Sequence, residues 1–598
     1  MKDTLKKLIP VFCAVIVIIL LIIIIIVKDN DNNEPALPTV SDTTYNPTPS
    51  QAPSSTAQAT QTPVITTPPA TEPPATPLPE FSPYAVDSTK PSNMMNDSKI
   101  NNIFVEVNGV QVPSYTTDTK IDFSTGNVYS SVEGIITFRG NNFRDSGAYG
   151  TVNMTEFAFE KVWMHETGMM EGIGTSSGSH IWRGCGWTGQ PLAVKWPKTT
   201  RAIMNMYDWA KEADELVEVI YATMDGNIYF YELYTGEPTR PPMFVGHIFK
   251  GAGALDPRGY PLMYCGSGDA SVNGTARAFI INLIDCTILY QFGIKGDPFA
   301  KRNWTAYDSS ALVDAETDTL IYPGENGIVY FVKLNSEYNE AEGTISVNPE
   351  ITKWRYYGKK SSGSKFYLGI EASAVAWRGH LFLADNGGHL MCLNINTLEL
   401  VWVQDLLDDT NCTPVLELEN GHPYLYVSTS FHGGWRYSLD SVADIPVMKI
   451  DAVTGEIVWR IDYPCYTVKD VSGGVQGTIA IGKNNVSDLI FVPVARYPTK
   501  KEGRIVAISK ETGEQVWSYD NTPKYSWSSP TVVYNSDGDG FIIWASTSGY
   551  IYIIDARTGV LLNEISLKGG LIEASPIVYD NMVVIGTKGM QIHGVKLK

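Results

Sequence analysis

Short segments of alternating apolar and polar positions recur along residues 151–598. Residues 550–555, Tyr-Ile-Tyr-Ile-Ile-Asp, show the pattern, which is typical of a β-strand with one buried face. A Thr-Gly pair follows this segment and marks a tight turn, in which Gly559 is free to take a positive φ. Because the same strand and turn recur around Gly455 and Gly513, the pattern predicts a series of antiparallel strand pairs.

Two further positions keep a fixed spacing from each turn glycine. Four residues before the glycine stands a short polar residue, whose side chain can accept backbone N–H bonds across the turn. Four residues after it stands a tryptophan, which we expect to be a large anchor buried between neighbouring sheets. The polar residues are Asn394, Asp451, Ser509 and Asp555, and the tryptophans are Trp402, Trp459 and Trp517, with Leu398 in place of the first glycine.

Each repeat opens with a strand of small residues, such as Ser-Ser-Pro-Thr-Val at 528–532 and Ala-Ser-Pro-Ile-Val at 574–578. Small side chains suit a crowded inner strand beside a central axis. Four antiparallel strands per unit, repeated about every 40 to 65 residues, predict an all-β, eight-bladed β-propeller. The predicted inner strands begin near Gln190, Ala252, Ser310, Ser373, Thr413, Thr478, Ser529 and Ser575.

The last repeat ends at Lys598 after three strands. We expect its missing outer strand to come from residues 159–163, Phe-Glu-Lys-Val-Trp, at the start of the domain. Such closure joins the two ends of the ring and removes an exposed sheet edge. The first repeats are degenerate, with Arg240 in place of the tryptophan and Cys286 in place of a glycine.

These motifs resemble the PQQ-binding-like β-propeller repeat family of the quinoprotein alcohol dehydrogenase-like superfamily, over residues 151–598. The resemblance implies the propeller fold but leaves function open, because the fold serves enzymes and non-catalytic scaffolds alike. Residues 134–144 resemble a lead-in segment found before such propellers in membrane-anchored proteins of Gram-positive bacteria. We expect Arg139 and Arg144 of this segment to pack against the propeller's rim, with ligand binding as the alternative.

The chain before the propeller divides by composition. Residues 1–7 carry three lysines, and residues 8–27 are an uninterrupted apolar run, long enough to cross ~30 Å of hydrocarbon. We expect a cytoplasmic tail, an uncleaved transmembrane helix and an extracellular propeller at the cell membrane, with a cleaved signal peptide as the alternative. Residues 28–80, rich in Pro and Thr, predict a disordered linker, and residues 81–150 a lead-in segment with a β-hairpin at 103–112.

Charge and cysteine content narrow the function. The 598-residue chain has 64 acidic and 45 basic residues and a net charge of −19, which argues against a nucleic-acid partner. None of the seven cysteines shows the Cys-x-x-Cys spacing of a zinc or redox motif, so we expect no metal site of that kind. Most should be buried small hydrophobes.

Candidate chemistry lies in the loops that lead into the inner strands, because these loops converge on one end of the central channel. They carry acids beside aromatic residues, a combination that suits a cation, a sugar or a quinone cofactor. The interpretation we prefer is that the acids satisfy backbone N–H groups at the strand starts, with ligand binding as the alternative. The candidate ligand-binding residues are Trp182, Arg183, Arg302, Trp304, Asp308, Glu371, Trp527 and Glu573.

Three functions remain open. The first is a non-catalytic scaffold that binds protein or cell-envelope polymer. The second is a PQQ-dependent dehydrogenase, for which the resemblance implies calcium, a catalytic Asp, a Trp floor and often adjacent cysteines. No two cysteines are adjacent in this chain, so we expect neither cofactor nor catalysis. The third is a carbohydrate-binding surface protein, suggested by 11% aromatic residues, which interblade packing explains equally well.

Overall fold

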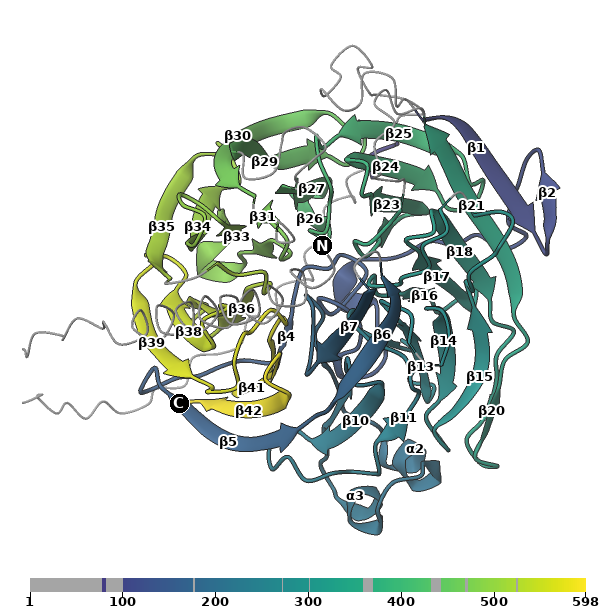
Figure 1. Cartoon of the computed structure of the whole chain (residues 1–598), viewed down its shortest axis with the longest axis horizontal. Coiled ribbons are helices and arrows are strands. Elements are labelled where there is room, and N and C mark those ends of the chain that lie inside the picture. The colour runs from purple at the N-terminus through teal and green to yellow at the C-terminus, as the bar shows by residue number, and fades with distance from the viewer. Residues whose placement is uncertain are drawn as a thin grey trace, which may run out of the picture. The chain divides into compact units, whose positions relative to one another are not determined.

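The computed structural model describes residues 78–81, 100–175, 178–271, 273–300, 302–358, 369–431, 442–467, 472–522 and 525–598. The chain divides into two units, Met1–Ala75 and Thr76–Lys598, and all of the described residues belong to the second. In these residues, eight antiparallel sheets of four or more strands stand around one axis (Figure 1). The predicted all-β, eight-bladed propeller is confirmed.

Each blade runs from an inner strand beside the axis to an outer strand at the rim. Blade 1 has, in that order, β8 (Leu192–Val194), β9 (Glu218–Ala222), β10 (Asn227–Glu232) and β11 (Met243–Phe244); blade 2 has β12 (Ala254–Leu255), β13 (Leu262–Gly266), β14 (Ala278–Asn282) and β15 (Thr287–Phe292). Blade 3 has β16 (Leu312–Asp314), β17 (Thr319–Pro323), β18 (Ile328–Lys333) and β21 (Glu350–Gly358); blade 4 has β22 (Val375–Trp377), β23 (His380–Ala384), β24 (His389–Asn394) and β25 (Leu400–Asp405).

Blades 5 to 8 follow the same order. Blade 5 has β26 (Val415–Glu419), β27 (His422–Ser428), β29 (Val442–Asp451) and β30 (Ile457–Tyr466); blade 6 has β32 (Ala480–Ile481), β33 (Leu489–Ala495), β34 (Gly503–Ser509) and β35 (Gln515–Thr522), with β28 (Ser430–Phe431) and β31 (Gly473–Gly474) beside them. Blade 7 has β36 (Thr531–Tyr534), β37 (Gly540–Ala545), β38 (Tyr550–Asp555) and β39 (Leu561–Ser566); blade 8 has β40 (Ile577–Tyr579), β41 (Met582–Thr587), β42 (Gln591–Leu597) and β5 (Phe159–Glu166).

The remaining elements are additions to the ring. They are the strands β1 (Ile100–Val107), β2 (Val110–Val112), β3 (Gly134–Ile135), β4 (Ala148–Tyr149), β6 (Met169–Thr175), β7 (Gly178–Arg183), β19 (Glu337–Asn339) and β20 (Thr344–Ser346), and the short helices η1 (Gly126–Val128), α2 (Lys198–Ile203), α3 (Asp208–Glu212) and η2 (Asn484–Val486). The predicted hairpin at 103–112 is β1–β2, which pairs with the outer edge of blade 3 through β21.

The turn glycine of one blade receives the tryptophan of the blade before it. Gly513 has φ +74°, and a Cβ there would lie 2.7 Å from the ring of Trp459. The Trp459 indole N–H also donates to the Lys510 carbonyl at 2.8 Å, in the same turn. The repeat motif is therefore a latch between blades, which confirms the predicted role of the tryptophans. Equivalent bonds run from Trp163 to Leu233, Trp354 to Leu398, Trp402 to Ala452 and Trp517 to Ala556.

Blade 8 closes the ring as predicted. β5 pairs antiparallel with β42, and Trp163 lies opposite Gly594 in the register. Trp163 then latches onto Gly236 of blade 1, where a Cβ would lie 2.5 Å from its ring. The outer strand of the last blade therefore comes from the beginning of the domain, which places β5 beside β42 in Figure 1.

Hydroxyl groups link the inner strands around the channel. The backbone N–H at the start of one inner strand donates to the side-chain hydroxyl of the next blade, from Ser310 to Ser373, 2.9 Å, and from Ser373 to Thr413, 3.0 Å. Blades 6 to 8 repeat this, from Thr478 to Ser529 and from Ser529 to Ser575. The small residues that open these repeats thus accept hydrogen bonds from the neighbouring blade, and their size also suits the crowded channel.

Residues 134–149, which we call the central plug, lie against the innermost strands rather than at the rim. Arg139 and Arg144 are buried, at 1% and 0% exposure, so the expected packing against the rim is wrong. A guanidinium offers five donors, which suits it to backbone carbonyls that no neighbouring strand can satisfy. The plug reaches each blade in turn: β3 pairs with β8, Leu255 N–H donates to Ile136 O, Arg144 to Ser310 O, Ala376 N–H to Asn142 O, Leu416 N–H to Phe143 O, Lys483 to Asp145, Arg139 to Pro530 O, and β4 pairs with β40.

In the part of the chain that the structure describes, no helix is long and apolar enough to cross a membrane. The predicted transmembrane helix at 8–27 and nearly all of the predicted linker at 28–80 lie outside the described residues. These remain predictions.

Candidate binding site at the channel mouth

Three carboxylates meet at one end of the channel. Asp308 and Glu371 stand just before the inner strands β16 and β22, and Glu325 stands in the turn between β17 and β18. One carboxylate oxygen of each lies within 4.8 Å of the others. We call these three residues the acid cluster. Antiparallel topology explains the meeting, because the loop into the first strand of a blade and the turn between its second and third strands lie at the same end.

The acid cluster is poorly compensated. Burial and the neighbouring Asp269 raise the pKa of Asp308 to about 6, although Lys250 opposes the shift. Burial, with Asp409 and Asp308, raises the pKa of Glu371 to about 7. Burial, with the neighbouring carboxylates of Glu371 and Asp308, raises the pKa of Glu325 well above its usual 4.5. The cluster therefore holds protons at pH values where exposed carboxylates have lost theirs.

Few hydrogen bonds reach these carboxylates. Oδ1 of Asp308 is sealed from solvent and has no hydrogen-bond partner among the described residues. Glu325 is 5% exposed and its only ion pair in the described part of the chain is with Arg302, at 4.0 Å. Asn386 donates to Glu371 Oε2 at 3.2 Å and to Asp409 Oδ1 at 2.8 Å, and it accepts from Arg302 at 3.0 Å. The preferred interpretation, that the acids satisfy N–H groups at the strand starts, is wrong for Asp308 and Glu371, because the N–H groups of Ser310 and Ser373 donate to hydroxyls of the next blade.

An aromatic group adjoins the acid cluster through Lys250. The Lys250 ammonium lies 4.0 Å from the centre of the Trp182 ring. The backbone carbonyl of Lys250 accepts from the backbone N–H of Trp187 at 3.4 Å. Trp187 contacts Trp527 at 5.3 Å between ring centres. The indole N–H of Trp527 is buried without an acceptor among the described residues. This aromatic group, Trp182, Trp187 and Trp527, presents ring faces to cations.

Four of the eight candidate residues belong to these two groups, and two more lie next to them. Arg302, Asp308 and Glu371 belong to the acid cluster or contact it. Trp182 and Trp527 belong to the aromatic group, and Glu573 pairs at 3.4 Å with Lys588, whose ammonium lies 5.3 Å from the Trp182 ring centre. Arg183 is exposed at the end of β7 and Trp304 is half-buried; neither has a hydrogen bond or ion pair to the two groups among the described residues. Whether the eight residues bind a ligand stays a prediction.

Sequence reasoning missed Glu325, Asn386, Lys250 and Lys588. Three of them, Glu325, Asn386 and Lys588, stand in turns between the second and third strands of their blades. The sequence prediction rests on the loops into the inner strands and does not include these turns. The predicted antiparallel topology places the loops into the inner strands and the turns between the second and third strands at one end of the channel. This topology would have identified the missed residues.

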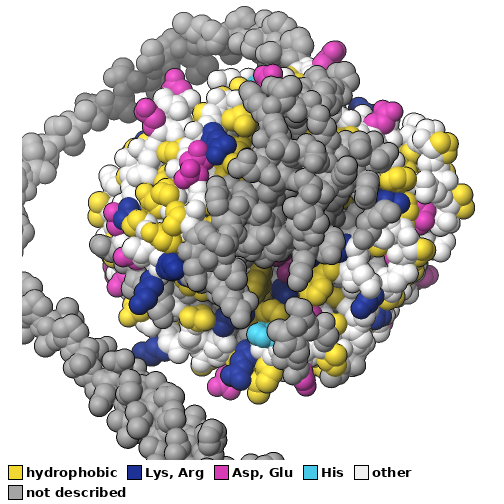
Figure 2. Space-filling view, turned by 45° about the horizontal axis from the view of Figure 1, so that its top comes forward, with side chains coloured by type: hydrophobic (Ala, Val, Ile, Leu, Met, Phe, Trp, Pro, Cys, Tyr) yellow, Lys and Arg dark blue, Asp and Glu magenta, His cyan; other side chains and the backbone are white. Residues whose placement is uncertain are grey.

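The remaining channel is narrow. A cavity of about 20 Å³ is lined by Asp308 and Glu371 of the acid cluster, by Phe138 of the plug, and by Ser373 and Thr413 at the starts of the inner strands. This volume accommodates about one water molecule. On the described part of the face in Figure 2, acidic, basic and hydrophobic side chains are interspersed.

The family resemblance implies PQQ and calcium. Carboxylate and amide oxygens from Asp308, Glu325, Glu371 and Asn386 are the donors that a hard cation prefers. The quinone fits poorly, because PQQ itself carries three carboxyl groups and the cluster already crowds carboxylates whose ionised forms are disfavoured.

The cysteines that the structure describes show no sign of an activated thiol. The six that the structure describes are free, and five are buried, as expected for small core hydrophobes. Burial raises the pKa of Cys185 and of Cys465, which keeps these thiols protonated and unreactive.

Comparison with known proteins supports the repeat assignment. Residues 501–596 match the PQQ-like repeat family model described as outer membrane protein assembly factor BamB. The quinone-type alcohol dehydrogenase, dehydrogenase subunit, of Komagataeibacter europaeus is 24% identical over 250 residues, 32% of this chain and 33% of the relative. The outer membrane protein assembly factor BamB of Kangiella koreensis is 24% identical over 234 residues, 37% of this chain and 49% of the relative. The matched region thus spans a third to a half of each relative's length.

Two solved structures align with this chain at low identity. BamB from Moraxella catarrhalis aligns with a TM-score of 0.42 and 15% identity, over 68% of this chain and 96% of that one. A europium-containing methanol dehydrogenase aligns with a TM-score of 0.39 and 11% identity, over 78% of this chain and 98% of that one. The blade order described above makes the chain an eight-bladed β-propeller, and its residues 501–596 match the PQQ-like repeat model.

Proposed function

We propose that this protein is a non-catalytic binding scaffold of the cell envelope, which receives a cationic group of a protein partner at the channel mouth. The observation that carries the proposal is the acid cluster, in which three carboxylates lie within 4.8 Å of one another. An ammonium or guanidinium group placed among them would restore their ionised forms. Part of the electrostatic cost of the empty cluster would then become binding free energy.

The surroundings favour an organic cation from a partner. The aromatic group lies beside the acid cluster, and Trp187 is only half-buried, so it can offer a ring face to an incoming side chain. Lys250 already occupies such a position on Trp182, which supports the same geometry for a partner's lysine or arginine. A partner side chain would reach the acid cluster and the aromatic group together.

The scaffold role has two further supports. One matched relative is named an assembly factor, which is a role that requires protein contacts and no chemistry. The apolar run at 8–27 would anchor the chain in the membrane, with the acidic propeller outside the cell. Both the anchoring and the location belong to the proposal.

The test uses the Thr76–Lys598 unit, which carries its own closed ring. Binding of hexalysine is measured by calorimetry at physiological salt, for the wild type, for Asp308→Asn/Glu371→Gln, and for the control Glu237→Gln/Glu316→Gln. The control removes the same formal charge from exposed positions outside the mouth. We expect one site that the mouth variant weakens about tenfold or more and the control leaves within about twofold.

Equal binding by the mouth variant and the control would refute the proposed site. Dye-linked alcohol oxidation is measured in parallel, with PQQ and calcium added. Turnover under those conditions would overturn the non-catalytic part of the proposal and favour the dehydrogenase. Absence of turnover with mouth-dependent hexalysine binding is the expected result.

A further inference from the structure

A second, unrelated cavity lies between blades 3 and 4, away from the channel mouth. It is a groove of about 600 Å³, within the size range of small-molecule sites. One wall is the sheet of blade 3, and the other is the loop that follows β2. The groove is lined by Val107, Asn108, Val112, Ser114, Tyr115, Thr116, Thr117, Asp118, Thr119, Ile121, Thr317, Thr319, Phe331, Lys333, Asn335, Glu350, Thr352 and Ile395.

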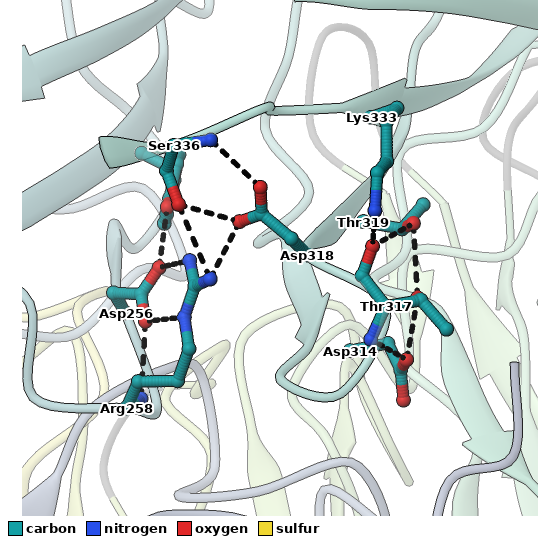
Figure 3. A network of polar contacts seen from close by, with 9 residues as sticks. Asp256, Arg258, Asp314, Thr317, Asp318, Thr319, Lys333 and Ser336 are labelled. Atoms are coloured by element: carbon teal, nitrogen blue, oxygen red, sulfur yellow. Dashed lines mark hydrogen bonds and ion pairs between the residues drawn. The ribbon is translucent and has the colours of Figure 1, made fainter. Parts of the chain in front are cut away.

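The sheet wall is held rigidly by the turn between β16 and β17 (Figure 3). The Thr317 hydroxyl donates to Asp314 at 2.5 Å, and the Thr319 hydroxyl donates to the Thr317 carbonyl at 3.2 Å. The same carbonyl accepts from the Lys333 ammonium. On the other side of the turn, Asp318 pairs with Arg258 at 2.6 Å. These bonds fix the polar groups that face the groove.

The loop wall is fastened to blade 4 by one residue. Asn396 accepts from the Ile121 N–H at 2.8 Å through its side-chain oxygen, and its amide donates to the Ile121 carbonyl at 3.0 Å. The backbone N–H of Thr117 donates to the Asn396 carbonyl at 2.9 Å. Asn396 therefore ties both ends of residues 117–121 to a neighbouring blade, and the wall is preorganised.

The groove offers free hydrogen-bonding groups above an apolar floor. Among the described residues, the side chains of Ser114, Thr116 and Thr119 have no hydrogen-bond partner, and all three are exposed. Phe331 and Ile121 form part of the floor, at 4% exposure each. The hydroxyls would be available to a ligand without breaking existing bonds.

The charges in the groove exclude several ligand classes. One ammonium, Lys333, faces two carboxylates, Asp118 and Glu350, and Glu350 already accepts from Asn335 at 3.0 Å. A phosphate or nucleotide site would need a cluster of cations, and a metal site would need converging acids. A lipid or an apolar helix would need a lining without so many hydroxyls.

We propose that this groove binds a neutral oligosaccharide, whose hydroxyls would exchange bonds with Ser114, Thr116 and Thr119 while its apolar ring face lies on the floor. The preorganised walls lower the entropic cost of binding. The site is independent of the channel mouth and of the proposed cationic partner.

The experiment titrates the Thr76–Lys598 unit by calorimetry with cellotetraose, maltotetraose and N-acetylchitotetraose, up to about 10 mM. Tetragalacturonate serves as the charged comparison. The variant Thr116→Val/Thr119→Val keeps the shape of the loop and removes two hydroxyls. The control Thr155→Val/Thr344→Val makes the same change at exposed positions that do not line the groove.

We expect at least one neutral tetrasaccharide to bind, with about tenfold weaker binding in the groove variant and no change in the control. Bound sugar should also slow hydrogen exchange in residues 113–121, a readout that does not depend on the variant. The proposal would be overturned by the absence of binding of all three sugars, by tighter binding of tetragalacturonate, or by equal binding in the two variants.

Discussion

The central plug makes a testable claim about stability through Arg144. Its guanidinium donates to the carbonyls of Ala374, Phe138 and Ser310, each at 2.9 Å, and none of these carbonyls has another donor among the described residues. Burial lowers the pKa of Arg144 to about 10, so the group still carries its charge at neutral pH. The substitution Arg144→Met keeps most of the volume and removes every donor.

The magnitude follows from those three carbonyls. Each buried acceptor left without a donor costs about 1–3 kcal/mol. Partial relaxation and water entering the space reduce the sum, so we expect Arg144→Met to lower the free energy of unfolding by about 3 to 5 kcal/mol. Arg144→Lys should lower the free energy of unfolding by less than Arg144→Met does, but still measurably, because one ammonium cannot reach carbonyls on three separate segments.

The assay is urea unfolding of the Thr76–Lys598 unit, followed by tryptophan fluorescence. Arg460→Met is the matched control, since Arg460 is half-exposed at the rim and its side chain pairs, among the described residues, only with Asp462, at 2.7 Å. We expect the control to cost less than about 1 kcal/mol. If Arg144→Met costs no more than Arg460→Met, the plug is not held by this guanidinium and the reasoning fails.

Three further predictions follow from the latch, the acid cluster and ring closure. Gly513→Ala should lower the free energy of unfolding in urea by about 2 kcal/mol or more, because φ is positive and the new Cβ meets Trp459 at 2.7 Å; an unchanged midpoint would refute the latch. The pKa of Glu371 near 7, against its usual 4.5, means that the folded protein keeps a proton that the unfolded chain releases, so this residue makes stability fall as pH rises from 4.5 to 7. Thermal unfolding of Glu371→Gln should therefore lose part of that pH dependence and melt higher than wild type at pH above 7. Trp163→Ala should cost about 3–5 kcal/mol by thermal or urea unfolding, and deletion of residues 151–165 more, since blade 8 would lose its outer strand.

The blade count was predictable because each repeat motif acts on its immediate neighbour. The spacing between Trp459 and Gly513 is a property of two adjacent blades, so the same residues recur wherever the contact recurs. Trp354 escaped the pattern although it makes the same bond, to Leu398. The β19–β20 hairpin lies between the turn of blade 3 and this tryptophan, and it breaks the fixed spacing.

The position of the plug was not predictable in the same way. Residues 134–144 contain two arginines in an apolar stretch, and such a pattern fits an exposed rim as well as a buried centre. Only the closed ring brings the carbonyls of Ser310, Ala374 and Pro530 to one axis, where the arginines find them. Contacts that span the whole ring leave no local signature in the sequence.

The acid cluster lies close to backbone groups whose hydrogen bonds are met by side chains. At the strand starts, hydroxyls such as Ser373 meet backbone N–H groups, and in the plug Arg144 meets three carbonyls. A few residues away, in the described part of the chain, Asp308 keeps a sealed oxygen without a donor, and Glu325 has only a distant cation. Buried polar groups are normally paired, and Asp308 Oδ1 is one of several buried side-chain atoms without a partner among the described residues; unlike most of them, it belongs to a group of three crowded carboxylates. The channel mouth is therefore where a positively charged ligand should bind most favourably. Stability and binding should respond to mutation there in opposite directions: neutralising Glu371 should stabilise the fold at neutral pH and weaken the binding of a cation.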